Sequence, residues 1–458
     1  MRLYFLLLFI FVIILTIVLP GCQNKKHTAD KSAGNVPTWI NGYPLYEIYV
    51  RSFSEEGTFK GLEKRLPELK EYGIKNIWLM PIHPIGQKGK KGSLGCPYSV
   101  RDYFDVNSEC GTKADFKSLV ETVHKLDMKI IIDMVANHCA NDYVEMINHP
   151  DWFSQDSSGT FTREVADWSD VTDWNFDNPE VNDYLEKAML YWIEEYDIDG
   201  YRCDVAGMVP DDFWKIVIPK LRNAKKDIFM LAEWEDPRMY TDGFNSDYDW
   251  NLYHRMVLHN EGDISVDSLW EAVEWRLRSF PSSGLPLRFV ENHDQERTMA
   301  VFGKDDYYLY AALVLTLPGI PLLYNGQETG EAHKPSLFEK EPILWKNAGE
   351  SVKAFYKDIL RIRDQEKMLR EGEVKRIFVS DDERVLSFIR SIDRMNEVIV
   401  LNFSDESVSG KLPPDLAAES MLWDEVYSYP VSGDEKTEYD MQQIFTVAAK
   451  GFRIFKSK

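Results

Sequence analysis

The feature that most constrains the fold is a repeated alternation of short apolar runs with helical segments along most of the chain. Strands covered by helices on both faces read as unbroken apolar runs, whereas the covering helices repeat their apolar residues every three or four positions. The runs predicted as strands are residues 45–50, 76–80, 129–135, 200–203, 228–232, 287–290 and 320–324, with a weak signal at 244–250. Helices are predicted at residues 59–72, 114–126, 180–195, 211–223 and 307–317. Eight such units predict an α/β fold, a (β/α)8 TIM barrel with loop insertions.

A doubly wound open sheet is the alternative that the alternation alone leaves open. Such a sheet usually carries a Gly-rich nucleotide-binding loop after its first strand. Here the first predicted strand is followed by Arg51-Ser52-Phe53, which contains no glycine. The sequence therefore favours the barrel.

The pattern changes after about residue 365. Short alternating segments at residues 374–378, 385–389, 398–403 and 452–455 are separated by turn-forming residues, which is typical of antiparallel strands. The predicted organisation is a signal peptide at 1–21, a lipidated tether at 22–38, a catalytic barrel at 39–365 and a C-terminal β-sandwich-like domain at 366–458. Within the barrel, residues 139–178 are predicted as a short insertion after the third strand.

The N-terminus has the pattern of an export signal. Residues 3–19 are almost continuously apolar, and Gly21 and Cys22 follow before a polar stretch. This resembles a bacterial lipoprotein signal, with cleavage before Cys22 and lipid on its sulfur, although Pro20 is unusual there. An uncleaved signal anchor is the alternative, because the run approaches the length of a membrane span. Both interpretations export the protein, and lipidation of Cys22 predicts a membrane-anchored lipoprotein.

Four cysteines remain if Cys22 carries lipid: Cys96, Cys110, Cys139 and Cys203. A Cys96–Cys110 disulfide in an oxidising compartment and four free thiols are both left open. Their spacing lacks the close pairs of a zinc site.

The charge balance excludes one class of partner. The formal net charge is −22, which repels polyanions, so nucleic acid is not expected as a ligand. The one basic cluster, at residues 88–91, is interpreted as a solvated loop.

Polar residues follow four of the predicted barrel strands. In such barrels the catalytic groups lie where strands end and loops begin. An acid or a histidine stands directly after each apolar run in the segments Asp133-Met134-Val135-Ala136-Asn137-His138, Tyr201-Arg202-Cys203-Asp204, Ala232-Glu233-Trp234 and Glu291-Asn292-His293-Asp294. Four such segments in succession predict an active site at this end of the barrel.

These four segments resemble the signature regions of the α-amylase superfamily, glycoside hydrolase family 13. The resemblance covers roughly residues 43–345 and includes the 80–84 segment Met-Pro-Ile-His-Pro, the 98–103 segment and residues 318–328. It implies an enzyme that cleaves α-glucosidic bonds in starch-derived glucans or maltooligosaccharides. A transglycosylase on the same fold and a non-catalytic glycan-binding protein are the alternatives.

The resemblance also implies a role for each site residue. Asp204 is the expected nucleophile, which forms a covalent glycosyl intermediate, Glu233 the general acid and Asp294 a third carboxylate on the same sugar ring. His138 and His293 match imidazoles that bind this ring, and Tyr98 matches a stacking tyrosine. Retaining glycosidases need two carboxyl groups about 5–5.5 Å apart. Arg202 lies two residues before Asp204, so strand alternation points both side chains the same way and Arg202 can keep Asp204 ionised.

A departure from the family and an incomplete match to it limit the prediction. Many members carry a Lys-His pair shortly after the nucleophile, where this chain has Val205-Ala206-Gly207-Met208, which leaves exo-acting and transferase activities open. Asn137 matches a calcium ligand of other members, but its partner ligands are not identified in the sequence. No cofactor is expected to be required, and bound calcium stays open.

Overall fold

The computed structural model describes residues 36–347, 349–413, 416, 422–430, 438–440 and 444–458. The predicted signal peptide and Cys22 therefore lie outside the described residues. Eight parallel strands close into a barrel in the order β1-β2-β3-β6-β7-β8-β9-β10, and β10 pairs back with β1. The strands are β1 (Leu45–Ile48), β2 (Asn76–Leu79), β3 (Lys129–Met134), β6 (Gly200–Cys203), β7 (Phe229–Ala232), β8 (Ser246–Tyr248), β9 (Leu285–Arg288) and β10 (Ile320–Tyr324). The predicted (β/α)8 barrel is confirmed.

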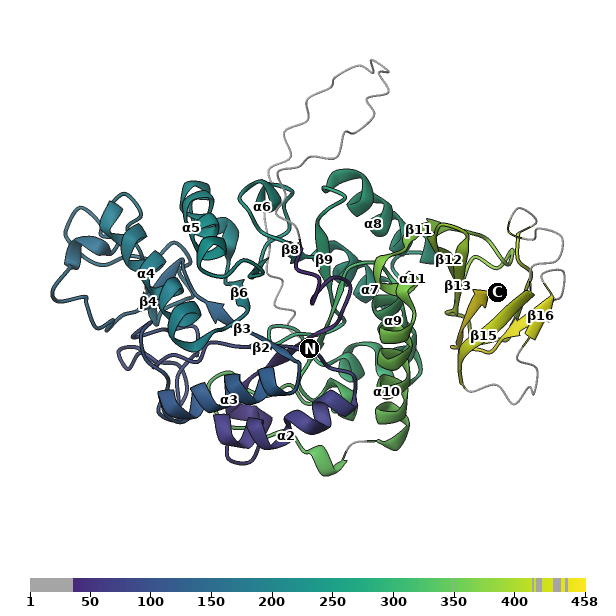
Figure 1. Ribbon diagram of the computed structural model, residues 1–458, viewed down its shortest axis with the longest axis horizontal. Coiled ribbons are helices and arrows are strands. Elements are labelled where there is room, and N and C mark those ends of the chain that lie inside the picture. The colour runs from purple at the N-terminus through teal and green to yellow at the C-terminus, as the bar shows by residue number, and fades with distance from the viewer. Residues whose placement is uncertain (1–35, 348, 414–415, 417–421, 431–437, 441–443) are drawn as a thin grey trace, which may run out of the picture.

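Helices cover the outside of the barrel (Figure 1). Several begin at residues suited to capping: Thr112 and Asp115 form a reciprocal capping box at the start of α3, and the Asn178 side chain accepts from Glu180 N–H at the start of α4. The helices are α1 (Val50–Phe53), α2 (Phe59–Glu71), α3 (Lys113–Lys125), α4 (Pro179–Tyr196), α5 (Asp211–Ala224), α6 (Arg238–Thr241), α7 (Trp250–Glu261), α8 (Val266–Ser279), α9 (Thr298–Thr316), α10 (Glu350–Gln365) and α11 (Lys367–Glu371).

The core lies between the strands and these helices. All four residues of β2 are buried, and so are the three central isoleucines of β3. Burial on both faces explains why these strands have no polar alternation. Among the described residues, no helix is both long and apolar enough to cross a membrane.

The predicted insertion after the third barrel strand is present. It begins with β4 (His138–Ala140), which pairs antiparallel with β5 (Val171–Asp173) so that His138 faces Asp173. The rings of Tyr143 and Trp174 pack edge to face 5.1 Å apart and give the insertion its own apolar centre. The short β4–β5 ladder holds His138 at the mouth of the barrel.

The C-terminal part is antiparallel, as predicted. Its larger sheet has the order β11-β12-β13-β18-β15-β16, and β14 and β17 form a second, two-stranded sheet. The strands are β11 (Glu373–Arg376), β12 (Val385–Ile392), β13 (Met395–Asn402), β14 (Val408–Gly410), β15 (Leu422–Tyr429), β16 (Glu438–Asp440), β17 (Phe445–Val447) and β18 (Phe452–Ser457). Figure 1 shows this part at one end of the molecule, beyond α9 and α10, and the insertion with β4 at the other end. The Phe388 ring stacks on Trp270 of α8 at 5.9 Å and so joins the sheet to the barrel.

Several predicted bounds differ from the structure. The first strand stops at Ile48, because Val50 already begins α1, and β9 lies two residues before the predicted run 287–290. Phe289 and Val290 are buried although they follow the strand, so their apolar character reflects packing and not ladder hydrogen bonds. The helix predicted at 307–317 begins at Thr298 and bends at Gly303, where φ is +70°.

The structure decides between the disulfide and the free thiols that the sequence left open for the four cysteines. Cys96, Cys110, Cys139 and Cys203 are all free thiols, and all except Cys96 are buried. The Cys96–Cys110 disulfide is therefore not formed in this structure. Burial raises the pKa of both thiols, to about 12 for each, so neither is a ready nucleophile.

Candidate active site

The carboxyl ends of the barrel strands surround a cavity of about 210 Å³. Asp204 follows β6, Glu233 follows β7, and His293 and Asp294 come from the segment after β9. Of the residues predicted from the sequence, the cavity is lined by Tyr98, His138, Asp204, Glu233, His293 and Asp294. The structure thus brings together side chains that are up to 196 positions apart by numbering, from Tyr98 to Asp294.

Arg202 lies beneath the cavity and is fully buried. Its Nη1 contacts Asp204 Oδ1 at 2.7 Å and Asp133 Oδ1 at 2.9 Å, while its Nη2 lies 2.8 Å from Glu233 Oε1. A buried guanidinium requires such partners, because an unpaired charge in the interior is strongly unfavourable. One cation therefore holds three carboxyl groups, including the two expected to act on the glycosidic bond.

Glu233 has the environment of a general acid. Burial is the largest influence on its pKa, and the neighbouring carboxylates Asp204 and Asp294 add to it, so that the pKa rises to about 8 against the opposing effect of Arg202. The backbone N–H of Val205 donates to Glu233 Oε2 over 2.8 Å and fixes the carboxyl group. Glu233 is therefore protonated at neutral pH and can donate its proton.

His293 carries positive charge beside Asp294. Burial opposes that charge, but Asp294 and Glu47 outweigh it and raise the pKa of His293 to about 9. Its Nε2 lies 3.3 Å from Asp294 Oδ2, and its Nδ1 contacts the Glu47 carboxylate. The Tyr98 hydroxyl accepts from His293 Nε2 at 2.8 Å and donates to Asp133 Oδ2 at 3.1 Å. These bonds fix the Tyr98 ring, which stacks against the imidazole at 5.3 Å.

His138 is buried and neutral, because burial lowers its pKa. Its ring lies 5.0 Å from that of Trp168, and Asn137 Nδ2 is 3.3 Å from His138 Nδ1. Across the ranges that the structure describes, no three His, Cys, Asp or Glu side chains gather into a group that could hold a metal ion.

Several contributors to the site were not identified from the sequence. Glu47 of β1 is fully buried and contacts His293, and its only sequence signal is a carboxylate inside an apolar run. Trp168 and Lys91 line the cavity as well. The interpretation of the basic cluster as a solvated loop is wrong for Lys91, whose Nζ lies 3.2 Å from the buried Asp170 carboxylate.

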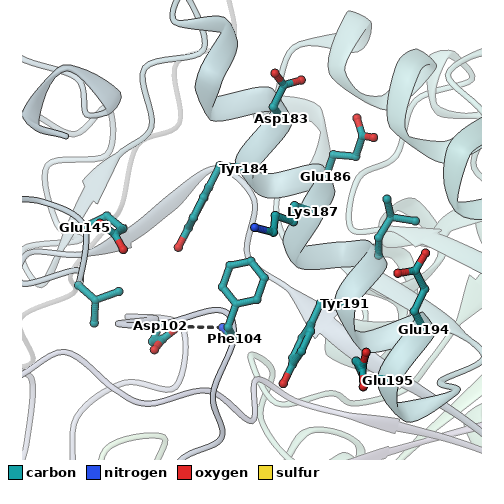
Figure 2. Close-up of a pocket in the computed structure, with 12 residues that line it drawn as sticks. Asp102, Phe104, Glu145, Asp183, Tyr184, Glu186, Lys187, Tyr191, Glu194 and Glu195 are labelled. Atoms are coloured by element: carbon teal, nitrogen blue, oxygen red, sulfur yellow. Dashed lines mark hydrogen bonds between the residues drawn. The ribbon is translucent and has the colours of Figure 1, made fainter. Parts of the chain in front are cut away.

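A larger hollow, of about 750 Å³, lies elsewhere, against the outer side of α4 (Figure 2). Tyr184 and Tyr191 of α4 face Phe104 there, and the carboxylates of Asp183, Glu186, Glu194 and Glu195 come from the same helix. It contains none of the predicted catalytic residues. The smaller cavity is the candidate active site because it combines opposed carboxyl groups with a shifted pKa.

A (β/α)8 barrel whose strand ends hold a protonated carboxyl group beside a paired carboxylate has the architecture of a glycoside hydrolase. The family model for the alpha amylase catalytic domain matches residues 29–168 and 141–371 of this chain. The chain therefore belongs to the α-amylase family and is an α-amylase-type glycoside hydrolase.

Individual relatives agree with this assignment. The crystal structure of the maltogenic alpha-amylase AmyB from Thermotoga neapolitana superposes with a TM-score of 0.82 at 31% identity, covering 92% of this chain and 99% of that one. Alpha-amylase 3 of Dictyoglomus thermophilum is 27% identical over 80% of this chain and 85% of its own length. Alpha-amylase MalA of Haloarcula japonica is 28% identical over 90% of this chain, but the match spans only 63% of that relative.

Proposed function

We propose that the protein is a retaining hydrolase of α-glucosidic bonds in starch-derived glucans or maltooligosaccharides. The observation that carries this proposal is the sharing of Arg202 between Asp204 and Glu233, with Glu233 held protonated. Retention requires two carboxyl groups close together in opposite protonation states. The relatives named as α-amylases and a maltogenic α-amylase support an α-glucan as the substrate.

The reaction then proceeds in two displacements. An Asp204 oxygen attacks the anomeric carbon while Glu233 gives its proton to the glycosidic oxygen, so the leaving sugar departs as an alcohol. The resulting glycosyl ester on Asp204 is attacked by water, which loses its proton to the Glu233 carboxylate as the ester bond breaks. The enzyme regains its starting protonation, and the product keeps the α configuration.

The remaining side chains stabilise the charge that develops on the sugar ring. The Asp294 carboxylate and the charged His293 lie side by side at the cavity, where they can bind ring hydroxyls. The neutral His138 lines the same cavity and offers a further ring nitrogen, and the Tyr98 ring provides an apolar face for stacking. Such fixed groups in a buried site stabilise the transition state more than they would in water.

Product release from maltoheptaose tests the proposal. The parent enzyme, as a soluble form lacking residues before Ser32, is compared with Asp204→Asn and with the exposed control Asp212→Asn. We expect breakdown by the parent and the control, a loss of several orders of magnitude in Asp204→Asn, and a first product in the α configuration by NMR. Products longer than seven units would indicate transglycosylation through the same intermediate. Binding without turnover by the parent would contradict a hydrolase and favour a glycan-binding protein.

Two further expectations concern the whole chain. We propose that the protein is exported and anchored in a membrane by lipid on Cys22, on the strength of the apolar run and Gly21-Cys22 in its sequence. The full-length chain should incorporate labelled fatty acid when expressed, and Cys22→Ser should abolish that incorporation. We also propose that catalysis requires no cofactor, since the steps above use only side chains of the protein.

A further inference from the structure

The position of Glu233 gives the active-site cavity a direction. Under the proposed function, Glu233 protonates the oxygen of the departing sugar, so that sugar lies on the Glu233 side. The sugar unit that becomes attached to Asp204 lies on the other side of the cleaved bond. Any units that precede it in the glucan, up to the non-reducing end, extend away from Glu233. What surrounds the cavity away from Glu233 therefore decides how many sugar units can precede the cleaved bond.

The barrel order shows which loops lie there. Glu233 follows β7, which stands opposite β1 in the closed ring of eight strands. The loops after β2 and β10 flank β1, so they form the wall opposite Glu233. The first supplies Lys91 and Cys96 to the cavity lining, and the second supplies Leu337 and Phe338.

These two loops are bonded to each other. Leu94 N–H donates to the Phe338 carbonyl at 3.1 Å, and Ser93 N–H donates to Glu339 Oε1 at 2.7 Å. Gly92 has a φ of +63°, and a Cβ at this position would lie 2.5 Å from the Phe338 Cβ. A glycine is thus required where the 88–96 loop crosses the β10 loop.

The 88–96 loop is also joined to the insertion. Lys91 Nζ lies 3.2 Å from Asp170 Oδ1 and donates to the Asp167 carbonyl at 3.1 Å. Asp170 is 3% exposed, and Trp168 beside it forms part of the cavity wall. Breaking an ion pair with a buried carboxylate costs more than breaking an exposed pair, because the buried carboxylate is left without a partner. The three loops therefore form a continuous wall.

The cavity is small. At about 210 Å³ the cavity lies below the range of about 300–1,000 Å³ that is usual for small-molecule sites. We infer that the wall formed by the 88–96 loop, held by the Lys91–Asp170 pair and the Leu94–Phe338 bond, limits the glycosyl side to a single sugar unit. The enzyme then removes glucose from the non-reducing end and does not cut within a glucan chain.

Two maltoheptaosides test this inference, one with a free non-reducing end and one whose terminal hydroxyls carry a cyclic acetal. We expect the free substrate to yield glucose first, and the blocked one to react at least about 100-fold more slowly, because the acetal does not fit a closed pocket. Lys91→Ala and, without any change of charge, Phe338→Ala should each raise cleavage of the blocked substrate about tenfold or more by opening the wall. Lys90→Ala, exposed on the same loop, should change neither rate.

The outcomes separate this inference from the function on which it rests. Equal cleavage of both substrates by the parent enzyme, with a ladder of products, would overturn exo action and leave the hydrolase intact. No cleavage of either would contradict the proposed function itself. Exo action that persists unchanged in both Lys91→Ala and Phe338→Ala would show that the wall is not what limits the glycosyl side.

Discussion

The backbone N–H of Val205 donates a 2.8 Å hydrogen bond to Glu233 Oε2, and Val205 makes it from a left-handed conformation with φ +36° and ψ +47°. A β-branched residue rarely adopts positive φ, because its side chain crowds the backbone. Val205 directly follows Asp204, so the turn that presents the nucleophile also fixes the acid. Backbone strain of this kind is found where a site requires one conformation.

Replacing Val205 tests whether strain is stored there. Val205→Gly should be at least as stable as Val205→Ala, because glycine removes a left-handed penalty of roughly 1–2 kcal/mol that alanine keeps. At an unstrained position glycine is instead less stable than alanine by about 0.5–1 kcal/mol. Urea denaturation of the two variants measures the difference, and the ordinary ranking of alanine above glycine would show that no strain is present. Activity should change little in Val205→Gly, since the N–H is retained.

The raised pKa of Glu233 predicts the alkaline limit of activity. The acid is protonated below a pKa of about 8, so kcat/KM on maltoheptaose should fall as pH rises through about 8. Folding stability should also decline between the ordinary pKa of 4.5 and about 8, because the folded state holds a proton that the unfolded chain releases. A profile that stays flat to pH 10 would contradict this assignment.

Glu233→Gln separates acid catalysis from structural damage. The variant should lose about 10²–10⁴-fold in kcat/KM on maltoheptaose, but much less in kcat/KM on an α-glucosyl fluoride, because the fluoride leaving group needs no proton and kcat/KM does not include the second step, in which Glu233 acts as the base. When the parent enzyme acts on the fluoride, its kcat/KM should no longer fall as the pH rises through about 8. Equal losses on both substrates would indicate that the site had been disordered.

The sequence predicted those parts of the fold that depend on burial. The β6 and β10 strands match the predicted ranges because both are apolar throughout most of their length and end at a polar residue or a turn. In contrast, β14 and β17 have three residues each, and neither was predicted, since so short a strand is defined by its partner and not by its own pattern.

The site likewise combines features that local sequence predicts with contacts that it does not predict. The positions of Asp204 and Glu233 followed from strand ends, which are local features. The contact between Glu47 and His293 joins two segments 246 positions apart, and the Lys91–Asp170 pair joins two loops. Such contacts depend on barrel closure and loop conformation, which no local pattern records. The alternative left open for the cysteines was likewise decided by the three-dimensional arrangement.

Chelation tests whether a cation contributes. No group of three His, Cys, Asp or Glu side chains that could hold a metal ion occurs within the described ranges, and the proposed steps use no metal. Treatment with EDTA should therefore leave both Tm and maltoheptaose turnover unchanged. A fall in Tm that calcium restores would reveal a site, and Asn137→Ala would then show whether Asn137 belongs to it.

Arg202 provides the sharpest test of the site, because stability and catalysis depend on the same contacts. Arg202→Met leaves Asp133, Asp204 and Glu233 without their cation, and breaking a buried pair of this kind costs about 3–5 kcal/mol. Arg202→Lys should restore the charge but little activity, since one ammonium cannot span carboxyl groups that two separate guanidinium nitrogens contact. Arg278→Met, at a guanidinium that is 71% exposed, is the matched control and should be nearly neutral.

Adding Asp133→Asn to Arg202→Met should recover part of the lost stability. It removes one of the carboxyl groups that Arg202→Met leaves without a cation, and it leaves unchanged the two that act on the sugar. Its activity should stay low, since Asp204 and Glu233 would still lack the group that holds them. Urea denaturation measures the first effect and kcat the second. If the double variant is less stable than Arg202→Met, the destabilisation comes from lost packing and not from uncompensated charge, and Arg202 would not stabilise the site by pairing with these carboxylates.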